Sequence, residues 1–208
     1  PLGPNKAEKV PVRMTKKILD SHHMPDKYLL YVGDINWNKN VTGLIESFSQ
    51  LSDPDLHLVL VGKVFTDKPN IKEYHQVVGA IEKSGKADKI IALGYVPSHH
   101  LSVLYSHATL YVQPSWYEGF GLPILEAMKF GCPVASSSLG SLPEIGGDAV
   151  AYFDPGKNMV KILESLLADQ GKLASLKQAG LIQAEKFNWD QTAILTHQIY
   201  EKVISNNT

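Results

Sequence analysis

The chain has 208 residues, of which 44% are hydrophobic and 20% charged, and this composition is typical of a folded domain with one substantial core. Twenty basic residues against twenty-one acidic ones leave a formal charge of -1 without long runs of either sign, which argues against a protein that coats nucleic acid. No apolar run approaches the roughly 20 residues of a membrane helix, and the single cysteine, Cys132, can form no internal disulfide. We therefore expect a cytoplasmic protein that does not bind nucleic acid.

Short apolar segments alternate with amphipathic ones along most of the chain. The apolar segments end in glycine, proline or polar residues and predict strands over 28–32, 56–61, 89–93, 109–113, 133–137 and 149–153. Hydrophobic residues at three- and four-residue spacing predict helices over 41–51, 71–81, 101–105 and 125–128. This alternation is typical of a parallel sheet covered on both faces. The sequence thus predicts one α/β Rossmann-like domain with a six-stranded parallel sheet flanked by helices.

Both ends of the chain depart from the alternation. After residues 154–156, helices are predicted in succession over 160–167, 172–187 and 190–204. Residues 1–27 have few periodic apolar positions and indicate a linker between domains with a leading helix. The domain then spans 28–208, and its terminal helix takes up 188–208.

The segment 115–128, SWYEGFGLPILEAM, joins a predicted strand to a predicted helix through glycines. Pro123 suits the first position of that helix, because a missing N–H costs nothing there, and Gly121 lies just before it. A helix N-terminus presents free N–H groups and the positive end of its dipole, and glycine lets a phosphate approach the backbone closely. We expect an anion such as a diphosphate to bind at this point.

Three charged side chains accompany this segment. Glu118 lies on the loop, and Glu126 lies about one turn into the helix. Lys39 follows the first strand, at the edge of the sheet where open α/β folds bind ligands. It also opens a helix, and because the helix dipole disfavours a cation there, a lysine at this position indicates a bound anion. Each has a structural alternative. Glu118 could cap a backbone N–H of its loop, Glu126 could be an ordinary exposed helix residue, and Lys39 could be a solvated lysine.

Six segments in order resemble retaining glycosyltransferase family 4, the group 1 glycosyl transferases with a GT-B fold: 1–3, 31–40, 58–62, 93–97, 118–126 and 131–144. The resemblance implies that the chain is half of a GT-B fold, namely the C-terminal domain that binds a nucleotide sugar. One position departs from the family, which often has Arg or Ser where this chain has Asp34. Because a carboxylate beside a diphosphate is unfavourable, Asp34 should point away, cap a backbone N–H or contact a ribose or sugar hydroxyl.

The resemblance also implies roles for individual residues. Glu126 would accept hydrogen bonds from the ribose hydroxyls, while Glu118 beside the transferred sugar and Lys39 on the diphosphate would be catalytic. For Tyr95 a place in the core is at least an equal alternative. Together with Lys39 and Glu126, the residues expected to bind the donor are Gly33, Asp34, Tyr95, Val96, Phe120, Gly121, Leu122 and Pro123.

The function implied by the resemblance is transfer of a hexose, with retention, from a nucleoside diphosphate sugar to a glycan or lipid-linked acceptor. The loop 33–40 resembles those of mannosyltransferase-like relatives, and this resemblance favours GDP-mannose slightly over a UDP-sugar as donor. The acceptor, and any peripheral contact with the inner face of a membrane, would belong to an N-terminal domain that this chain lacks, so the chain alone should not catalyse transfer. No cofactor or metal is expected, because the histidines show no recognised ligand spacing.

Two other classes of function remain open. One is a non-catalytic module that binds nucleotide sugars, in which Asp34 marks a weakened phosphate site. The other is a fragment of a Rossmann-like oxidoreductase, against which the missing G-x-G-x-x-G after the first strand argues.

Overall fold

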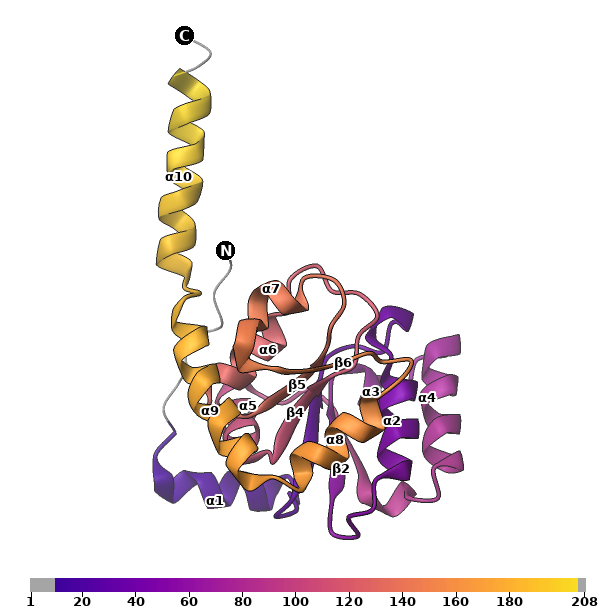
Figure 1. Cartoon of the computed structure of the whole chain (residues 1–208). Helices are drawn as coiled ribbons and strands as arrows, with labels where there is room; N and C mark the ends of the chain where they lie inside the picture. Colours follow the sequence, from indigo (N-terminus) through magenta and orange to yellow (C-terminus); the bar gives the residue numbers. More distant parts are fainter. Residues whose placement is uncertain (1–9, 206–208) are drawn as a thin grey trace.

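Six parallel strands form the centre of the computed structural model, which describes residues 10–205 (Figure 1). They are β1 (Tyr28–Val32), β2 (His57–Val61), β3 (Ile90–Leu93), β4 (Leu110–Gln113), β5 (Val134–Ser137) and β6 (Ala151–Phe153). The order across the sheet is β3-β2-β1-β4-β5-β6, and every neighbouring pair is parallel. The predicted α/β Rossmann-like fold is confirmed, with small differences at the strand ends. The segment 1–3 of the family resemblance lies outside the described residues.

The four inner strands bury both of their faces, which explains why their segments are mainly apolar. In β1, Leu29 and Tyr31 enter one hydrophobic cluster, whereas Tyr28 and Leu30 enter a second cluster on the opposite face. Successive side chains of a strand point to opposite faces, so helices on both sides of the sheet favour apolar residues along the whole strand.

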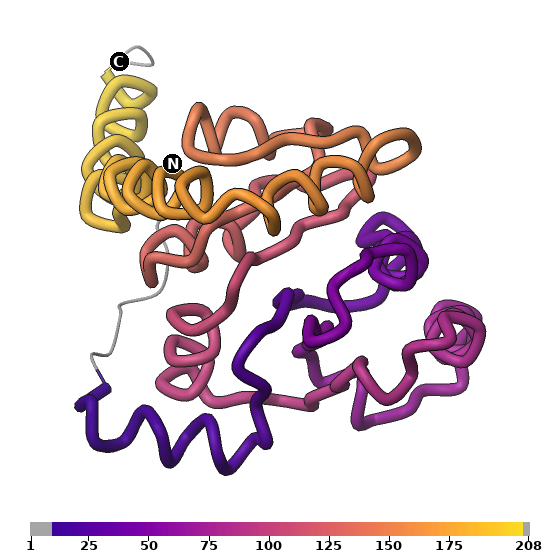
Figure 2. The backbone as a smooth tube through the Cα atoms, turned by 60° about the horizontal axis from the view of Figure 1, so that its bottom comes forward, coloured from indigo at the N-terminus to yellow at the C-terminus, as the bar shows by residue number. Residues whose placement is uncertain are grey.

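The helices divide between the two faces. The first face is covered by α2 (Val41–Gln50), α4 (Lys72–Lys83) and α8 (Met159–Leu167), and the second by α5 (Ser98–His107), α6 (Leu122–Lys129) and α7 (Leu142–Gly146). Helix α9 (Gln170–Glu185) contributes to both, through Leu173 and Leu176 on one side and Ala184 on the other. The predicted leading helix is α1 (Val12–Ser21), which lies beside α5 (Figure 2).

Short elements that hydrophobic periodicity did not predict complete the fold. They are the four-residue helix α3 (Val64–Asp67), the five-residue helix α7 and 3-10 turns at Trp37–Lys39, Ala87–Lys89 and Gly147–Ala149. The last turn takes up the start of the predicted strand 149–153, so β6 begins at Ala151. Elements this short have no full period of apolar residues to reveal them.

The last helix, α10 (Trp189–Ser205), stands away from the body of the domain (Figure 1). None of its described residues is buried, although it carries large hydrophobic side chains such as Ile199, which is 61% exposed, and Tyr200, which is 64% exposed. Within residues 10–205, no helix combines the length and the apolar character that a membrane span requires.

Candidate functional site

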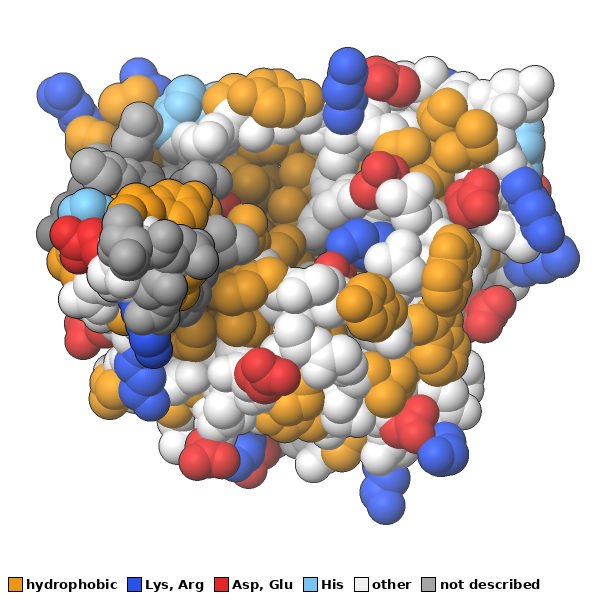
Figure 3. Space-filling view, turned by 90° about the horizontal axis from the view of Figure 1, so that it is seen from above, with side chains coloured by type: hydrophobic (Ala, Val, Ile, Leu, Met, Phe, Trp, Pro, Cys, Tyr) orange, Lys and Arg blue, Asp and Glu red, His pale blue; other side chains and the backbone are white. Residues whose placement is uncertain are grey.

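The candidate site lies where the strand order reverses, at the carboxyl ends of β1 and β4. These two strands are neighbours in the sheet, but the chain continues outward from them in opposite directions, through β2 on one side and β5 on the other. In open α/β sheets this reversal opens a crevice between the loops that follow the two strands. Figure 3 looks onto this end of the molecule and shows a hollow lined largely by hydrophobic side chains.

Three hydrogen bonds join the loop after β1 to the loop after β4. The Trp116 N–H donates to the Asn38 carbonyl at 2.8 Å, and the Asn38 side-chain amide donates to the Tyr117 carbonyl at 3.1 Å. The amide of Asn40, which is buried and has a left-handed backbone with φ of 52°, donates to the Pro114 carbonyl at 3.1 Å. The two loops therefore hold each other in a defined position.

This arrangement brings together the two residues predicted to be catalytic. The Lys39 ammonium Nζ lies 2.9 Å from Oε1 and 2.8 Å from Oε2 of Glu118. Glu118 is only 8% exposed, and its Oε1 also accepts from Gln113 Nε2 and from Ser115 Oγ, each at 2.7 Å. Glu118 is thus a buried carboxylate held by one cation and two neutral donors, and not a loop residue that caps a backbone N–H.

The sequence analysis did not identify Gln113, nor the pairing of Lys39 with Glu118. Gln113 is 1% exposed and is the polar member of an otherwise apolar and aromatic strand, LYVQ. A buried amide needs hydrogen-bond partners, so a glutamine at the carboxyl end of a buried strand was a signal of a nearby polar site.

The segment 140–144 also contacts the loop that carries Glu118. Ser141 Oγ donates to the carbonyls of Glu118 and Phe120, both at 2.9 Å. Gly140 has φ of +63°, and a Cβ at this position would lie 3.1 Å from both the N and the O of Glu118. Glycine is required here because the two backbones approach so closely.

A cavity of about 640 Å³ opens beside these loops, at the ends of β1, β2 and β3. Its lining includes five of the residues predicted to bind the donor, which are Gly33, Asp34, Tyr95, Val96 and Glu126. The alternative that Tyr95 belongs to the core is wrong, because this residue is 74% exposed. Lys39, Glu118 and residues 120–123 do not line the cavity.

Backbone geometry shapes the floor of this cavity. The Asp34 carboxylate accepts a hydrogen bond from the Ile35 N–H at 2.7 Å, so capping of a backbone N–H is the alternative that the structure supports. At the end of β2, a Cβ added to Gly62 would lie 2.1 Å from the Gly33 carbonyl oxygen. The backbones that follow β1 and β2 therefore leave no room for a side chain at position 62.

Glu126 reaches the cavity from α6, whose first residue is Leu122. Tyr105 donates its hydroxyl to Glu126 Oε2 at 3.3 Å, and burial raises the Tyr105 pKa well above its ordinary value, so the hydroxyl keeps its proton. The residue before α6, Gly121, has φ of +105°, and a Cβ there would lie 2.9 Å from Leu142 Cδ2. The preceding Phe120 ring packs edge-on against Phe187, with centroids 6.3 Å apart.

The chain matches the family model of the group 1 glycosyl transferases over residues 16–182. It belongs to this family. The match covers the sheet and every loop described above, so the family and the fold agree.

Relatives of the chain support its place in this family. The O-antigen chain mannosyltransferase B of Escherichia coli is 36% identical over 180 residues, covering 84% of this chain and 45% of that protein. The solved sucrose-phosphate synthase of Thermosynechococcus elongatus has a TM-score of 0.84 and 27% identity, covering 99% of this chain and 52% of that chain. HepE of Anabaena, solved with UDP-glucose, has the same fold at 22% identity, with a TM-score of 0.73, covering 94% of this chain and 54% of that chain. The chain spans about half the length of these proteins.

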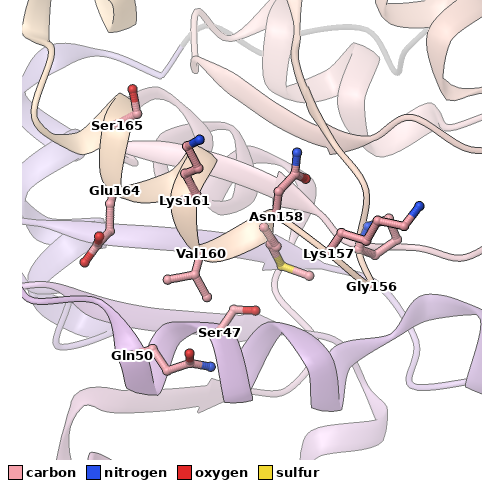
Figure 4. Close-up of a pocket in the computed structure, with 11 residues that line it drawn as sticks. Ser47, Gln50, Gly156, Lys157, Asn158, Val160, Lys161, Glu164 and Ser165 are labelled. Atoms are coloured by element: carbon pink, nitrogen blue, oxygen red, sulfur yellow. The ribbon is translucent and has the colours of Figure 1, made fainter.

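A second hollow, of about 720 Å³, lies between α2 and α8 (Figure 4). Ser47 and Gln50 line it from α2, and residues 155–161, 164 and 165 line it from the opposite side. It contains none of the predicted site residues, so size does not identify the site. Among residues 10–205, no three His, Cys, Asp or Glu side chains are arranged to hold a metal ion.

Proposed function

We propose that this chain is the donor-binding domain of a retaining glycosyltransferase, which transfers a hexose from a nucleoside diphosphate sugar to a glycan or lipid-linked acceptor. The observation that carries the proposal is the ion pair between Lys39 and the buried Glu118, beside a cavity that Glu126 lines. Such a donor requires a cation for its diphosphate, a carboxylate that faces the sugar and a carboxylate that binds the ribose. GDP-mannose is the donor we favour, since a mannosyltransferase is 36% identical to the chain.

In this proposal the cavity of about 640 Å³ holds the nucleoside. Glu126 accepts hydrogen bonds from the ribose hydroxyls, and Tyr95 and Val96 border the base. The diphosphate extends from Gly33 toward the start of α6, which offers the positive end of the helix dipole. Phe120, Gly121 and Leu122 act through their backbone N–H groups, which is consistent with the Phe120 side chain packing against Phe187, and Pro123 has no N–H to offer.

The ion pair then has two states. Without donor, Lys39 pairs with Glu118; the Lys39 side chain is 23% exposed, so an incoming diphosphate can reach it. With donor, Lys39 neutralises the departing diphosphate, and Glu118 faces the sugar and stabilises the positive charge that develops on it. The bond between the anomeric carbon and the diphosphate oxygen breaks while the acceptor oxygen attacks the same face. The proton of the acceptor hydroxyl passes to the diphosphate, so the reaction needs no separate nucleophile and no metal.

The acceptor lies outside this domain in our proposal. The chain spans about half the length of the relatives described above, and the apolar side chains of α10 are exposed. We propose that the remainder of the full-length protein binds the acceptor and makes any contact with a membrane.

A ligand screen by thermal shift and calorimetry tests the assignment. GDP and GDP-mannose should raise the unfolding temperature of the chain, because a ligand that binds only the folded state stabilises it by mass action. UDP and ADP serve as competing bases, and UDP clearly ahead of GDP would reverse the assignment of the donor. Preference for NAD over every nucleoside diphosphate would contradict the proposed function. Turnover by the full-length protein separates an enzyme from a non-catalytic module that binds nucleotide sugars.

A further inference from the structure

The buried end of β4 carries polar side chains that the core does not need. Gln113 is 1% exposed and Ser115 is fully buried. Gln113 Nε2 donates to Ser115 Oγ at 2.8 Å and to Glu118 Oε1 at 2.7 Å, and Ser115 Oγ donates to the same oxygen at 2.7 Å. Polar groups in the core are costly unless they are paired, so the purpose of this pair lies at Glu118 and not in apolar packing.

Tyr111 sets the direction of the Gln113 amide. The Tyr111 hydroxyl donates to Gln113 Oε1 at 2.5 Å. Burial raises the Tyr111 pKa well above its ordinary value, and the nearby Glu118 carboxylate adds to the effect, so the hydroxyl remains a donor. A flipped amide would place its oxygen against the Glu118 carboxylate, where two acceptors would face each other. The amide nitrogen is therefore the group that Glu118 meets.

The two oxygens of Glu118 consequently differ. Oε1 accepts from three donors, which are Gln113 Nε2, Ser115 Oγ and Lys39 Nζ. Within the described part of the chain, Oε2 accepts only from Lys39, at 2.8 Å. An oxygen of a carboxylate offers about two lone-pair sites, so Oε1 is saturated and Oε2 keeps acceptor capacity.

We propose that Gln113 and Ser115 are positioning residues, which lock Oε1 of Glu118 so that Oε2 is the oxygen presented to the donor sugar. This inference rests on the proposed function, in which Glu118 attends the transferred sugar. When a diphosphate draws Lys39 away, these two neutral donors are the contacts that keep the carboxylate in place.

Ser115→Ala and Gln113→Met in the full-length protein test the inference. Each variant removes a donor to Oε1, and we expect kcat to fall by about tenfold, the effect of one net hydrogen bond. The affinity for GDP should stay unchanged, because neither side chain contacts the nucleotide. The matched control is Ser136→Ala: Ser136 is a buried serine in register with Gln113 on β5, and its hydroxyl donates to the Ser137 carbonyl at 3.1 Å. This control should keep its kcat.

A double-mutant cycle with Glu118→Ala separates positioning from a general structural role. If Ser115 acts through Glu118, adding Ser115→Ala to Glu118→Ala should cause no further loss of rate. Equal losses in both backgrounds, or no loss in either, would overturn the positioning role while Glu118 kept its own. Full activity of Glu118→Ala would instead refute the role of Glu118 in the proposed function. Unfolding temperatures of all variants are measured in parallel. If Gln113→Met does not fold, the test rests on Ser115→Ala alone.

Discussion

At the scale of single residues, Lys39 and Glu118 depend on each other. Their side chains are 23% and 9% exposed, so each charge is largely removed from water and is compensated mainly by its partner. Removing one member of a buried pair leaves the other charge uncompensated, and the resulting loss of stability can be mistaken for a loss of function. Experiments on either residue therefore need an affinity measurement well below the unfolding temperature.

Lys39→Met should weaken GDP binding by about ten- to a hundredfold, since a charge-assisted hydrogen bond contributes roughly 1.5 to 3 kcal/mol. Binding of guanosine should change little, because the lost charge acts on the diphosphate. Isothermal calorimetry on the 208-residue chain measures both affinities. Lys157→Met is the control, since Lys157 is 80% exposed and lies outside the cavity. Equal affinities of the Lys39 variant and the parent for GDP would make Lys39 a structural residue.

Substitution of the two glutamates should affect binding and transfer differently. Glu126→Ala should weaken GDP and GDP-mannose alike, because both contain the ribose that we assign to Glu126. Glu118→Ala should not weaken GDP binding, because removing the carboxylate leaves Lys39 free for the diphosphate, while transfer by the full-length protein slows by about a hundred- to a thousandfold, the usual cost of losing a preorganised electrostatic group. Calorimetry and steady-state kinetics on the same variants test this. The reverse pattern would show that the roles are exchanged, and parallel loss of stability and of every activity would indicate structural roles.

At the scale of elements, a histidine contact links α1 to the start of α5. His22 Nε2 and His100 Nδ1 are 2.9 Å apart, and the His99 ring lies 4.5 Å from the His100 ring. Burial lowers the pKa of His22, and burial together with the neighbouring charges of His99 and His22 lowers that of His100. One ring must donate and the other accept, so the contact requires that at least one imidazole is neutral.

Acidification should therefore release α1 before the rest of the domain. Because the pKa values are lowered in the folded state, the unfolded chain binds protons more readily, and the stabilisation is present above about pH 6.5 and is lost as the pH falls below that value. Hydrogen exchange of α1 between pH 8 and pH 5 measures this. His22→Gln should flatten the pH dependence, whereas His75→Gln, at an exposed position, should not. Exchange of α1 that does not change with pH would contradict this prediction.

At the scale of the whole molecule, binding and transfer should separate. The chain should bind GDP through its own cavity but show no sugar transfer, which should return when the remainder of the full-length protein is restored. A radiolabelled GDP-mannose assay with the natural acceptor fraction measures transfer by both proteins. The full-length protein with Glu118→Ala is the control for background hydrolysis. Substantial transfer by residues 1–208 alone would refute the proposal that the acceptor lies outside this domain.

The sequence by itself determined the strands, the longer helices, the fold class and the family, because hydrophobic period, glycines and prolines act over a few neighbouring residues. It placed every strand and all the longer helices, and it selected five residues that line the cavity. It did not determine that Lys39 and Glu118, 79 positions apart, would meet, or that Tyr95 would be exposed. Those outcomes were decided by the tertiary structure, because the strand order sets which loops become neighbours, and the packing around each loop sets which side chains remain in water.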